Sequence, residues 1–367
     1  MIKILIILLM ITFSPMGKSA NPICEKYPNH PDSVPMECFN FQWRPGSGEP
    51  FYYVDNPACG KKIILPNCIN RTPWTEIPEG AFKNLGLTHV EFGVFIKKIG
   101  DFAFQNNQLK ELTLPGSFEL ENDFGHSLVV GEYAFENNQI EVLNFSLKPA
   151  DLKFCKRTPI NSEIKFYKYS FANNKIKRLN FTSSFKHSEI NWVSNGGCAP
   201  KEFGLPESDY DPTFYDGLLT IWNFFEGSFQ NNQIEHITFK NGIPVGFYLD
   251  MNSTWQDGGN PYIVVEKNIF RGNKIKEIVF NVDTLSYSRI IGINYRHFGE
   301  KLNFFQLFEN GLADRSYLKI KSGCQNQCDT ILKTFDPVSE NTCFETCPGY
   351  YIYDIHNKKL ISHQDEK

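Results

Sequence analysis

Six segments of this chain repeat one spacing of apolar residues, and that spacing limits the folds open to it. Each segment centres on a phenylalanine, here called the anchor, with apolar residues five positions before it and five, eight and ten positions after it. The anchors are Phe82, Phe104, Phe135, Phe171, Phe229 and Phe270. Apolar residues at plus eight and plus ten follow the two-residue period of a strand with one buried face. Each repeat therefore predicts one short strand.

The segment five residues before each anchor is interpreted as a second extended piece that ends in a turn, with Gly100 and Gly131 shortly after it. No stretch within a repeat has room for a helix. A single coil of this kind cannot bury its apolar side alone, whereas stacked coils bury a continuous column with parallel strands ~4.8 Å apart. We therefore expect a mainly β solenoid with one parallel sheet of about six short strands, flanked by disulfide-stapled caps. The anchors should form one column, and the residues at plus ten a second.

Asparagine recurs two or three residues after the anchor. The residues concerned are Asn84, Asn106, Asn107, Asn137, Asn138, Asn173, Asn174, Asn231, Asn232 and Asn273. An asparagine side chain bonds to nearby backbone groups and tolerates left-handed conformations, which suits a sharp turn before each strand. Stacked coils would align these amides into a ladder that satisfies buried turn amides. The alternative is that they are solvent-facing loop residues in an asparagine-rich chain.

The segment IKKIGDFAFQNNQLKELTLPGS, Ile96 to Ser117, resembles the repeat of BspA-like leucine-rich repeat proteins, which are secreted or surface proteins. The resemblance covers Ile77 to about Phe280, with a poorer echo from Ile290 to Phe305. It implies a solenoid fold and a role in adhesion or partner binding. The chain departs from the family in having few repeats, long insertions between them, and no wall-sorting signal after the array.

The distance between successive anchors varies from 22 residues (Phe82 to Phe104) to 58 (Phe171 to Phe229), yet each repeat is invariant from the anchor to plus ten. The extra residues therefore enter between the strand and the next extended piece, which places them on one edge of a solenoid. These insertions are Pro115 to Leu128, Ser146 to Ile164, Thr182 to Thr220 and Lys240 to Ile263.

Two of the ten cysteines, Cys155 and Cys198, fall in neighbouring insertions. We predict that they form a disulfide, which would close a long loop and contribute ~4 kcal/mol in the loop-entropy model. Two buried free thiols are the alternative.

The other eight cysteines gather at the two ends of the chain. Residues 21–73, with Cys24, Cys38, Cys59 and Cys68, are predicted to form an N-terminal cap, because the apolar end of a solenoid needs a cover. Residues 321–367 are predicted to be a C-terminal module with a loose polar tail from His356, with Cys324 paired to Cys347 and Cys328 to Cys343. A zinc site formed by these last four cysteines is the alternative. The array itself would occupy residues 74–320.

Residues 1–20 have the features of a secretory signal peptide: Lys3, an apolar run from Ile4 to Phe13, and a small-residue stretch. The run is shorter than the ~20 residues of a membrane-spanning helix, so we predict a secreted, extracellular or periplasmic protein with no membrane insertion after cleavage. Lipid attachment at Cys24 is an alternative that Pro22 and Ile23 disfavour. The oligomeric state is left open.

The net charge of −4 gives no electrostatic support to a nucleic-acid partner. The predicted partner is a protein or glycan, contacted through the exposed strand positions and the insertions, and no cofactor or metal is expected. The candidate binding residues of the sheet face are His89, Glu91, Glu111, Thr113, Asn144, Arg178, Asn180, His236, Thr238, Lys240 and Glu277.

Two other functions remain open from the sequence. Glu91 and Glu111 lie on adjacent predicted strands and could serve a secreted carbohydrate hydrolase as a carboxylate pair. A passive structural envelope component is the third possibility. The stretch Asp209 to Gly217 is acidic, but it lacks the Gly and Glu spacing of an EF-hand, so we interpret it as a solvated loop and not as a calcium site.

Four Asn-X-Ser/Thr motifs, the acceptor sequence for N-linked glycans, begin at Asn70, Asn144, Asn180 and Asn252. Asn144 and Asn180 are predicted to lie side by side on the sheet face. In a eukaryotic secretory pathway their glycans would block that face and move binding to the insertions. In a bacterium the motifs would be a coincidence in an asparagine-rich chain.

Overall fold

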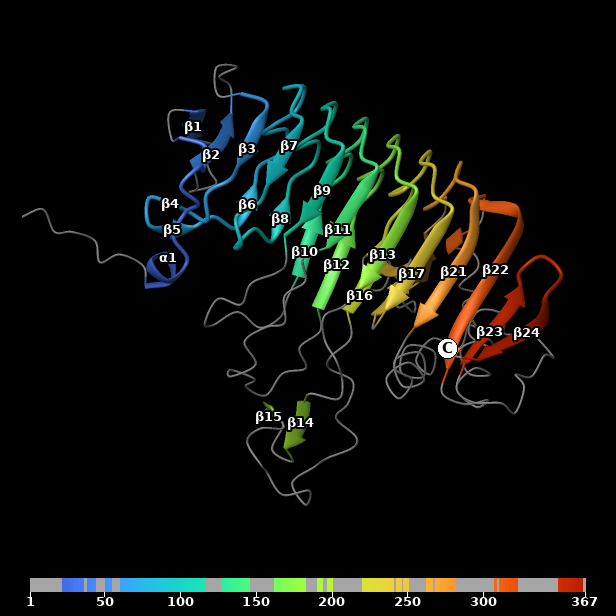
Figure 1. The fold of residues 1–367 in the computed structure, drawn as a ribbon. Coiled ribbons are helices and arrows are strands. Elements are labelled where there is room, and N and C mark those ends of the chain that lie inside the picture. The colour runs from blue at the N-terminus through green and yellow to red at the C-terminus, as the bar shows by residue number, and fades with distance from the viewer. Residues whose placement is uncertain are drawn as a thin grey trace, which may run out of the picture.

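The chain is represented by a computed structural model. It describes residues 22–35, 38–43, 50–54, 60–115, 127–145, 162–182, 190–193, 197–200, 220–240, 242–245, 247–250, 262–266, 268–281, 307–308, 310–322 and 349–365. Most of these residues belong to strands, and successive repeats lie side by side, from blue at the N-terminal end to red at the C-terminal end (Figure 1).

The predicted strand after each anchor is present in all six repeats. These strands are β7 (His89–Glu91), β9 (Glu111–Leu114), β11 (Val142–Phe145), β13 (Arg178–Thr182), β17 (His236–Lys240) and β21 (Ile275–Asn281). Strand β9 pairs with β11, and β13, β17 and β21 pair in that order, all in parallel. The register places equivalent residues opposite one another, for example Leu179, Ile237 and Ile278 at plus eight. These three side chains are fully buried, so the apolar spacing fixes the register.

The prediction of one parallel sheet was wrong. The strands after the anchors are divided among three sheets, which contain β7, the pair β9 and β11, and the run β13, β17 and β21. The segments before the anchors form a further sheet, here called the second sheet. Its strands, in order, are β6 (Glu76–Ile77), β8 (Lys98–Ile99), β10 (Ser127–Val130), β12 (Ser162–Phe166), β16 (Thr220–Phe224) and β18 (Gly242–Val245). The residues at minus five, among them Ile99, Val130 and Phe166, are paired in register and fully buried. Their side chains fill the space between the two sheets while their backbone groups bond to the neighbouring repeat.

The sixth repeat departs from this second sheet. Its own strand, β20 (Tyr262–Val265), pairs in antiparallel fashion with β19 (Phe247–Asp250). The place beside β16 is taken instead by β18, which comes from the preceding insertion. An insertion therefore replaces a strand that the repeat spacing alone would assign to the sheet.

The anchor phenylalanines form a continuous column of stacked rings, as the spacing predicts. All six are fully buried. Ring centroids of successive anchors lie 4.9 Å (Phe82 to Phe104), 5.2, 5.0, 5.3 and 5.7 Å apart. The column continues for one more ring to Phe308, at 5.2 Å from Phe270. This additional coil lies just after the echo predicted at Ile290 to Phe305, which is outside the described residues.

The residues at plus ten form a shorter second column. Phe145, Phe181 and Phe239 lie with centroids 5.3 and 5.0 Å apart. Leu114 occupies the equivalent place in the second repeat and is fully buried, so the column of rings begins only at the third repeat.

In five of the six repeats the residue three positions after the anchor is an asparagine, here called the turn asparagine, and it joins its own repeat to the preceding one. Asn174 is typical: its Nδ2 donates to the carbonyl oxygens of Phe171 (3.1 Å) and Phe135 (2.9 Å), the anchors of both repeats. Its Oδ1 accepts a hydrogen bond from the amide of Ile140 (3.1 Å) in the preceding repeat. The same bonds are made by Asn107, Asn138, Asn232 and Asn273. The predicted amide ladder is confirmed, and it is buried.

The asparagine two residues after the anchor provides a left-handed backbone conformation at the turn. Asn84, Asn106, Asn137, Asn173 and Asn231 all have left-handed backbones, with φ between 54° and 62°. Asparagine tolerates this conformation better than most residues. In the sixth repeat Gly272 takes the position, with φ 79°. These side chains are exposed and bond mainly to one another, as in Asn106 to Asn84 (2.9 Å) and Asn137 to Asn106 (3.0 Å).

Two buried serines precede their anchors directly and lack a partner for the side-chain hydroxyl. Ser170 and Ser228 are fully buried, and neither Oγ makes a hydrogen bond. Three other repeats have alanine at this position, Ala81, Ala103 and Ala134. We expect Ser170→Ala and Ser228→Ala each to raise the free energy of unfolding by about 1 kcal/mol, because an unpaired buried hydroxyl is removed without a change of shape.

Denaturant unfolding curves measure this effect, and Ser316→Ala is the matched control. Ser316 is equally buried, but its Oγ donates to the carbonyl oxygen of Ile275 (2.6 Å). Its substitution should therefore destabilise the protein. Equal shifts in the same direction for all three variants would contradict the explanation.

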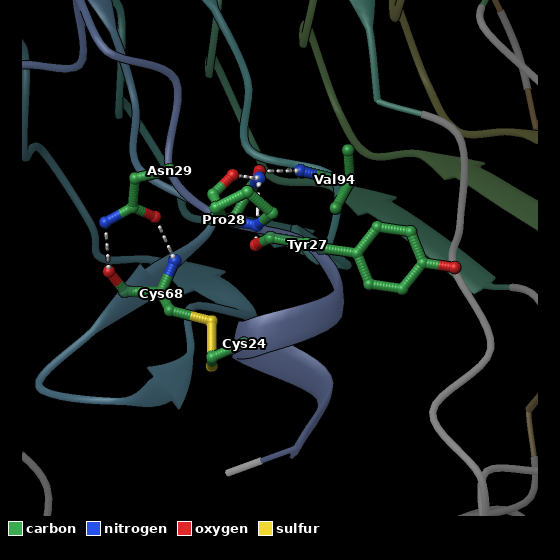
Figure 2. Close-up of a disulfide and its surroundings, with 7 residues drawn as sticks. Cys24, Tyr27, Pro28, Asn29, Cys68 and Val94 are labelled. Atoms are coloured by element: carbon green, nitrogen blue, oxygen red, sulfur yellow. Dashed lines mark hydrogen bonds between the residues drawn. A yellow bond between two sulfur atoms is a disulfide. The ribbon is translucent and has the colours of Figure 1, made fainter. Parts of the chain in front are cut away.

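A disulfide joins two parts of the predicted N-terminal cap, and Asn67 links Pro28 (2.8 Å) to the amide of Val94 (2.9 Å), just after the first repeat strand (Figure 2). Cys24 of α1 (Pro22–Lys26) is bonded to Cys68 of β4 (Cys68–Ile69), and Cys38 is also disulfide-bonded. Asn29 donates to the carbonyl oxygen of Cys68 (3.0 Å) and accepts from its amide (2.9 Å). Strand β4 forms a short hairpin with β5 (Thr72–Pro73), and β1 (Phe39–Trp43) forms another with β2 (Pro50–Val54).

Part of the predicted cap continues the repeat array. Strand β3 (Lys62–Ile64) pairs in parallel with β7, with Ile63 opposite Val90. Ile63 is fully buried. The array therefore begins one strand earlier than the six-fold spacing indicates.

The C-terminal tail was predicted to be loose, and that prediction was wrong. Strand β22 (Leu312–Ser322) pairs in parallel with β21, and then β23 (Gly349–Asp354) and β24 (Lys359–Asp365) add in antiparallel order. Tyr351 and Tyr353 of β23 are fully buried, which anchors the hairpin. At its turn the Asp354 carboxylate accepts bonds from the amides of Asn357 and His356, and these bonds lower the pKa of Asp354.

The remaining predicted disulfides lie outside the described residues in whole or in part. Cys59, Cys155, Cys324, Cys328, Cys343 and Cys347 are not described. Cys198 lies in β15 (Gly197–Pro200), which forms an antiparallel hairpin with β14 (Ile190–Val193). The pairing of Cys155 with Cys198 stays a prediction.

Candidate binding surface

The outward-facing residues of the strands after the anchors form the candidate binding surface, here called the sheet face. In a strand, alternate residues share a face, so the buried residue at plus eight leaves its neighbours at plus seven and plus nine on the other side. All eleven predicted binding residues fall on β7, β9, β11, β13, β17 and β21, whose order is visible in Figure 1. The structure therefore brings them to one side of the array.

The residues at plus seven form a row across the sheet. Glu111 lies opposite Val142, Arg178 opposite His236, and His236 opposite Glu277. Glu111 and Arg178 are exposed, whereas His89 at the first strand is half-buried. Val142 is 47 % exposed, which is unusual for a large apolar side chain on the described surface. Val142 therefore offers an apolar contact point between the acidic Glu111 and the basic Arg178.

The residues at plus nine form a second, mostly uncharged row. Thr113 lies opposite Asn144, and Asn180 opposite Thr238. Thr113, Asn144, Asn180 and the flanking Glu91 are exposed, and Thr238 is half-buried. Lys240 follows on β17, with its backbone opposite Thr182 and Asn281. This row offers amide and hydroxyl groups to a partner.

Several charges of the sheet face are paired with their own neighbours. His89 Nε2 lies 2.9 Å from Glu91 Oε1, and His236 Nδ1 lies 3.4 Å from Glu277 Oε2. Asn144 Nδ2 donates to Glu111 Oε1 at 3.4 Å. Beside this face, a hydrogen bond from Lys276 (2.9 Å) lowers the pKa of the Glu235 carboxyl. Glu91 and Glu111 thus bond to separate neighbours, His89 and Asn144.

The repeats extend the sheet face beyond the predicted residues. Strand β3 brings Lys62 and Ile64 beside His89 and Glu91. At the other end, β22 places Tyr317 and Lys319 opposite Glu277 and Val279. The sequence signal for both additions was weak, because neither strand follows an anchor with the full spacing.

The insertions leave the array at one edge. The strands end at aligned residues, Leu114 opposite Phe145 and Thr182 opposite Lys240. For three of the four insertions, the repeat strand at the far end begins at Ser127, Ser162 or Thr220, all in the second sheet. The predicted common edge is therefore seen at the ends of the insertions, while most of their residues lie outside the described part of the chain. We call this side the insertion edge.

Strained aromatic residues form a ladder near the anchors that the sequence reasoning missed. Phe102, Tyr133 and Tyr169, each two residues before an anchor, have φ of 56° to 58°. Their rings stack at 5.2 and 5.1 Å, and Lys83 Nζ lies 4.8 Å from the Phe102 ring centroid. Bulky residues rarely adopt this conformation, and other repeats have Gly80 or Gly227 here. Because the ring faces are covered by one another, the ladder stabilises the fold and offers little ring surface to a ligand.

Glu266 is a buried carboxyl beside this ladder. It is 7 % exposed, and its Oε2 accepts a hydrogen bond from the amide of Glu226 (2.9 Å). Burial raises the pKa of Glu266 above its ordinary value. Between the ordinary and the folded pKa, the folded chain holds a proton that the unfolded chain has released. The contribution of Glu266 to stability therefore falls as pH rises through that interval.

We expect Glu266→Gln to raise the melting temperature at pH 7 and to change it little near pH 4. The amide oxygen of glutamine can still accept from Glu226, while the cost of a buried charge is removed. Thermal melts at both pH values measure this, with the exposed Glu111→Gln as control. A gain that is larger at pH 4 than at pH 7 would contradict the assignment.

No helix among the described residues is long and apolar enough to cross a bilayer. Within the same residues, no group of three or more histidine, cysteine, aspartate or glutamate side chains is arranged to hold a metal ion.

The fold and the sheet face define a class: a repeat protein in which each repeat contributes a parallel strand with a buried apolar side and an exposed polar side. Residues 59–198 match the family model described as a BspA type leucine rich repeat region, in 6 copies. The resemblance of Ile96 to Ser117 to this repeat is thereby confirmed. No curated protein matches the chain.

The structural repeat extends further than the family match. The match ends at residue 198, whereas the column of stacked rings continues through Phe229, Phe270 and Phe308. The long insertions dilute the sequence pattern in this half of the chain without interrupting the packing.

Proposed function

We propose that this chain is a secreted binding protein that contacts a protein or glycan partner through the sheet face and the insertion edge. The repeats would form a solenoid with disulfide-stapled caps, and residues 1–20 would be its signal peptide. Repeat regions of the BspA type are commonly interaction or adhesion modules of surface or secreted proteins. The observation that carries the proposal is the sheet face itself, an open surface of aligned polar side chains on a fully packed support.

In the chain without glycans, the centre of this surface is the best candidate for the main contact. Val142 and Arg178 occupy the same row on neighbouring strands, and both are exposed. A rigid sheet holds them in place, so a partner that binds there loses little conformational freedom of the chain. Arginine is enriched among the residues that dominate binding energy at protein interfaces. A partner with a carboxylate beside an apolar group would match this pair.

The two alternative functions have less support. A hydrolase would need the carboxylates of Glu91 and Glu111 to act together, but they bond to His89 and Asn144 respectively. A passive envelope component would not need an ordered row of exposed side chains. We therefore propose a binding protein and not an enzyme.

The test is binding of the fluorescently labelled mature chain, produced without glycans, to a glycan array and to a panel of intact cells. A double variant, Val142→Asp with Arg178→Glu, should reduce binding at least about tenfold, the equivalent of about 1.4 kcal/mol. Lys110→Glu is the control, because Lys110 is exposed and lies just before β9, outside the plus-seven and plus-nine rows. Absence of binding by the folded wild-type chain would refute the proposal, and equal binding of all variants would remove the sheet face from it.

A further inference from the structure

Asn144 and Asn180 occupy the same plus-nine position on β11 and β13, and both side chains are exposed. Each begins an acceptor motif, Asn144-Phe145-Ser146 and Asn180-Phe181-Thr182. The middle residue of each motif belongs to the second aromatic column, and Phe181 is fully buried. The fold therefore turns the asparagine of each motif outward and holds its neighbour in the core.

The distribution of the motifs among the asparagines follows the needs of the fold. Each turn asparagine uses both hydrogens of Nδ2 to bind two anchor carbonyl oxygens, as Asn174 does, so a glycan there would break the ladder. None of the turn asparagines begins an acceptor motif. The motif asparagines in the described residues, Asn70, Asn144 and Asn180, are all exposed. The motif thus occurs where a substituted amide is compatible with the packed structure.

We propose that Asn144 and Asn180 are acceptors of N-linked glycans and that these glycans close the centre of the sheet face to protein partners. The inference rests on the proposed secretion, here through a eukaryotic pathway. In the transfer, Nδ2 attacks the anomeric carbon of a lipid diphosphate-linked oligosaccharide. The bond from that carbon to the diphosphate oxygen breaks, the lipid diphosphate leaves, and Nδ2 gives one proton to the transferase.

Glycosylation of these amides is compatible with the hydrogen bond that the Asn144 side chain makes. An N-linked asparagine retains one hydrogen on Nδ2, so Asn144 can still donate to Glu111, at present 3.4 Å away. Two glycans on neighbouring strands would stand beside the Val142 and Arg178 pair in the adjacent row. A protein partner of the glycosylated chain would then contact the insertion edge, whereas the unmodified chain would offer both surfaces.

The experiment expresses the full chain, from Met1, in a eukaryotic cell line and collects the secreted protein. Enzymatic release of N-glycans in ¹⁸O-labelled water converts each occupied asparagine to labelled aspartate, which peptide mass spectrometry locates. We expect label at positions 144 and 180, and loss of one glycan in each of Asn144→Gln and Asn180→Gln. Asn173, exposed but outside any motif, is the internal control and should stay unlabelled.

In a second version of the protein, a standard secretory signal peptide replaces residues 1–20. This version distinguishes a chain that is not secreted from a secreted chain whose Asn144 and Asn180 are not glycosylated. Secreted, folded chain with unlabelled Asn144 and Asn180 would overturn the proposal, whether or not Asn70 and Asn252 carry glycans. The occlusion is read from labelling of Arg178 by a dicarbonyl reagent, which should be slower before glycan release than after it. Equal rates would show that the glycans leave the sheet face open. Because neither readout needs a partner, their outcome is independent of the binding test.

Discussion

Phe171→Ala should lower the free energy of unfolding by about 3–5 kcal/mol, one of the largest effects of a single substitution in this chain. The Phe171 ring lies between Phe135 (5.0 Å) and Phe229 (5.3 Å) and is fully buried. Its removal would leave a cavity in the middle of the column that the rigid backbone turns on either side cannot close. Denaturant unfolding of the purified chain measures the loss.

The control for this variant is Val142→Ala, because Val142 is a large apolar side chain that is 47 % exposed. Its substitution should change stability by no more than about 0.5 kcal/mol. Similar losses for the two variants would mean that the anchor column is not the core of the array.

Asn174→Asp should destabilise the protein by about 3 kcal/mol or more, since each buried polar group left without a partner costs about 1–3 kcal/mol. The substitution keeps the shape of the side chain but removes its donors, so the carbonyl oxygens of Phe135 and Phe171 lose their bonds. It also places a carboxylate among buried oxygens. We expect the loss to shrink at low pH, where the acid is protonated and can donate once.

The neighbouring Asn173 provides the control. It is exposed and has φ 58°, the conformation that Gly272 adopts at the same position of the sixth repeat. Asn173→Gly should therefore be nearly neutral, within about 0.5 kcal/mol. If it destabilised the chain as much as Asn174→Asp does, the distinction between the two asparagine positions would fail.

The spacing of apolar residues was sufficient to predict the strands after the anchors, the column of rings and the amide ladder. These features depend on contacts that every repeat makes in the same way, so six copies reinforce one interpretation. The second sheet was not predicted. Two of its strands, Glu76–Ile77 and Lys98–Ile99, are too short to show a period, and its last strand, β18, comes from an insertion that the repeat spacing does not cover. Strands β22 to β24 were also missed, since their pairing joins residues far apart in sequence and repeats nothing.

The candidate binding residues could be placed on one face because strand geometry alone determines the side to which each residue points. The side-chain hydrogen bonds and ion pairs among these residues could not be predicted. Whether Glu91 bonds to His89 or approaches Glu111 depends on side-chain conformations, which the sequence does not encode locally. The exposure of Val142, by contrast, follows from its place at plus seven, an outward position that the other five repeats fill with a polar or charged residue.

The turn asparagines give the array a polarity that matters during synthesis. Each one satisfies groups of the repeat before it, so a turn is finished only after the following repeat has left the ribosome. In the sixth repeat a backbone group takes the place of the asparagine side chain, because the amide of Ile275 donates to the carbonyl oxygen of Gly311 (2.9 Å). Any side chain at position 311 would collide with Phe270. A nascent or C-terminally shortened chain that ends within the array therefore lacks the partner for the turn groups of its last repeat. In the full chain, the coil around Phe308 follows the sixth repeat and supplies a partner for these groups.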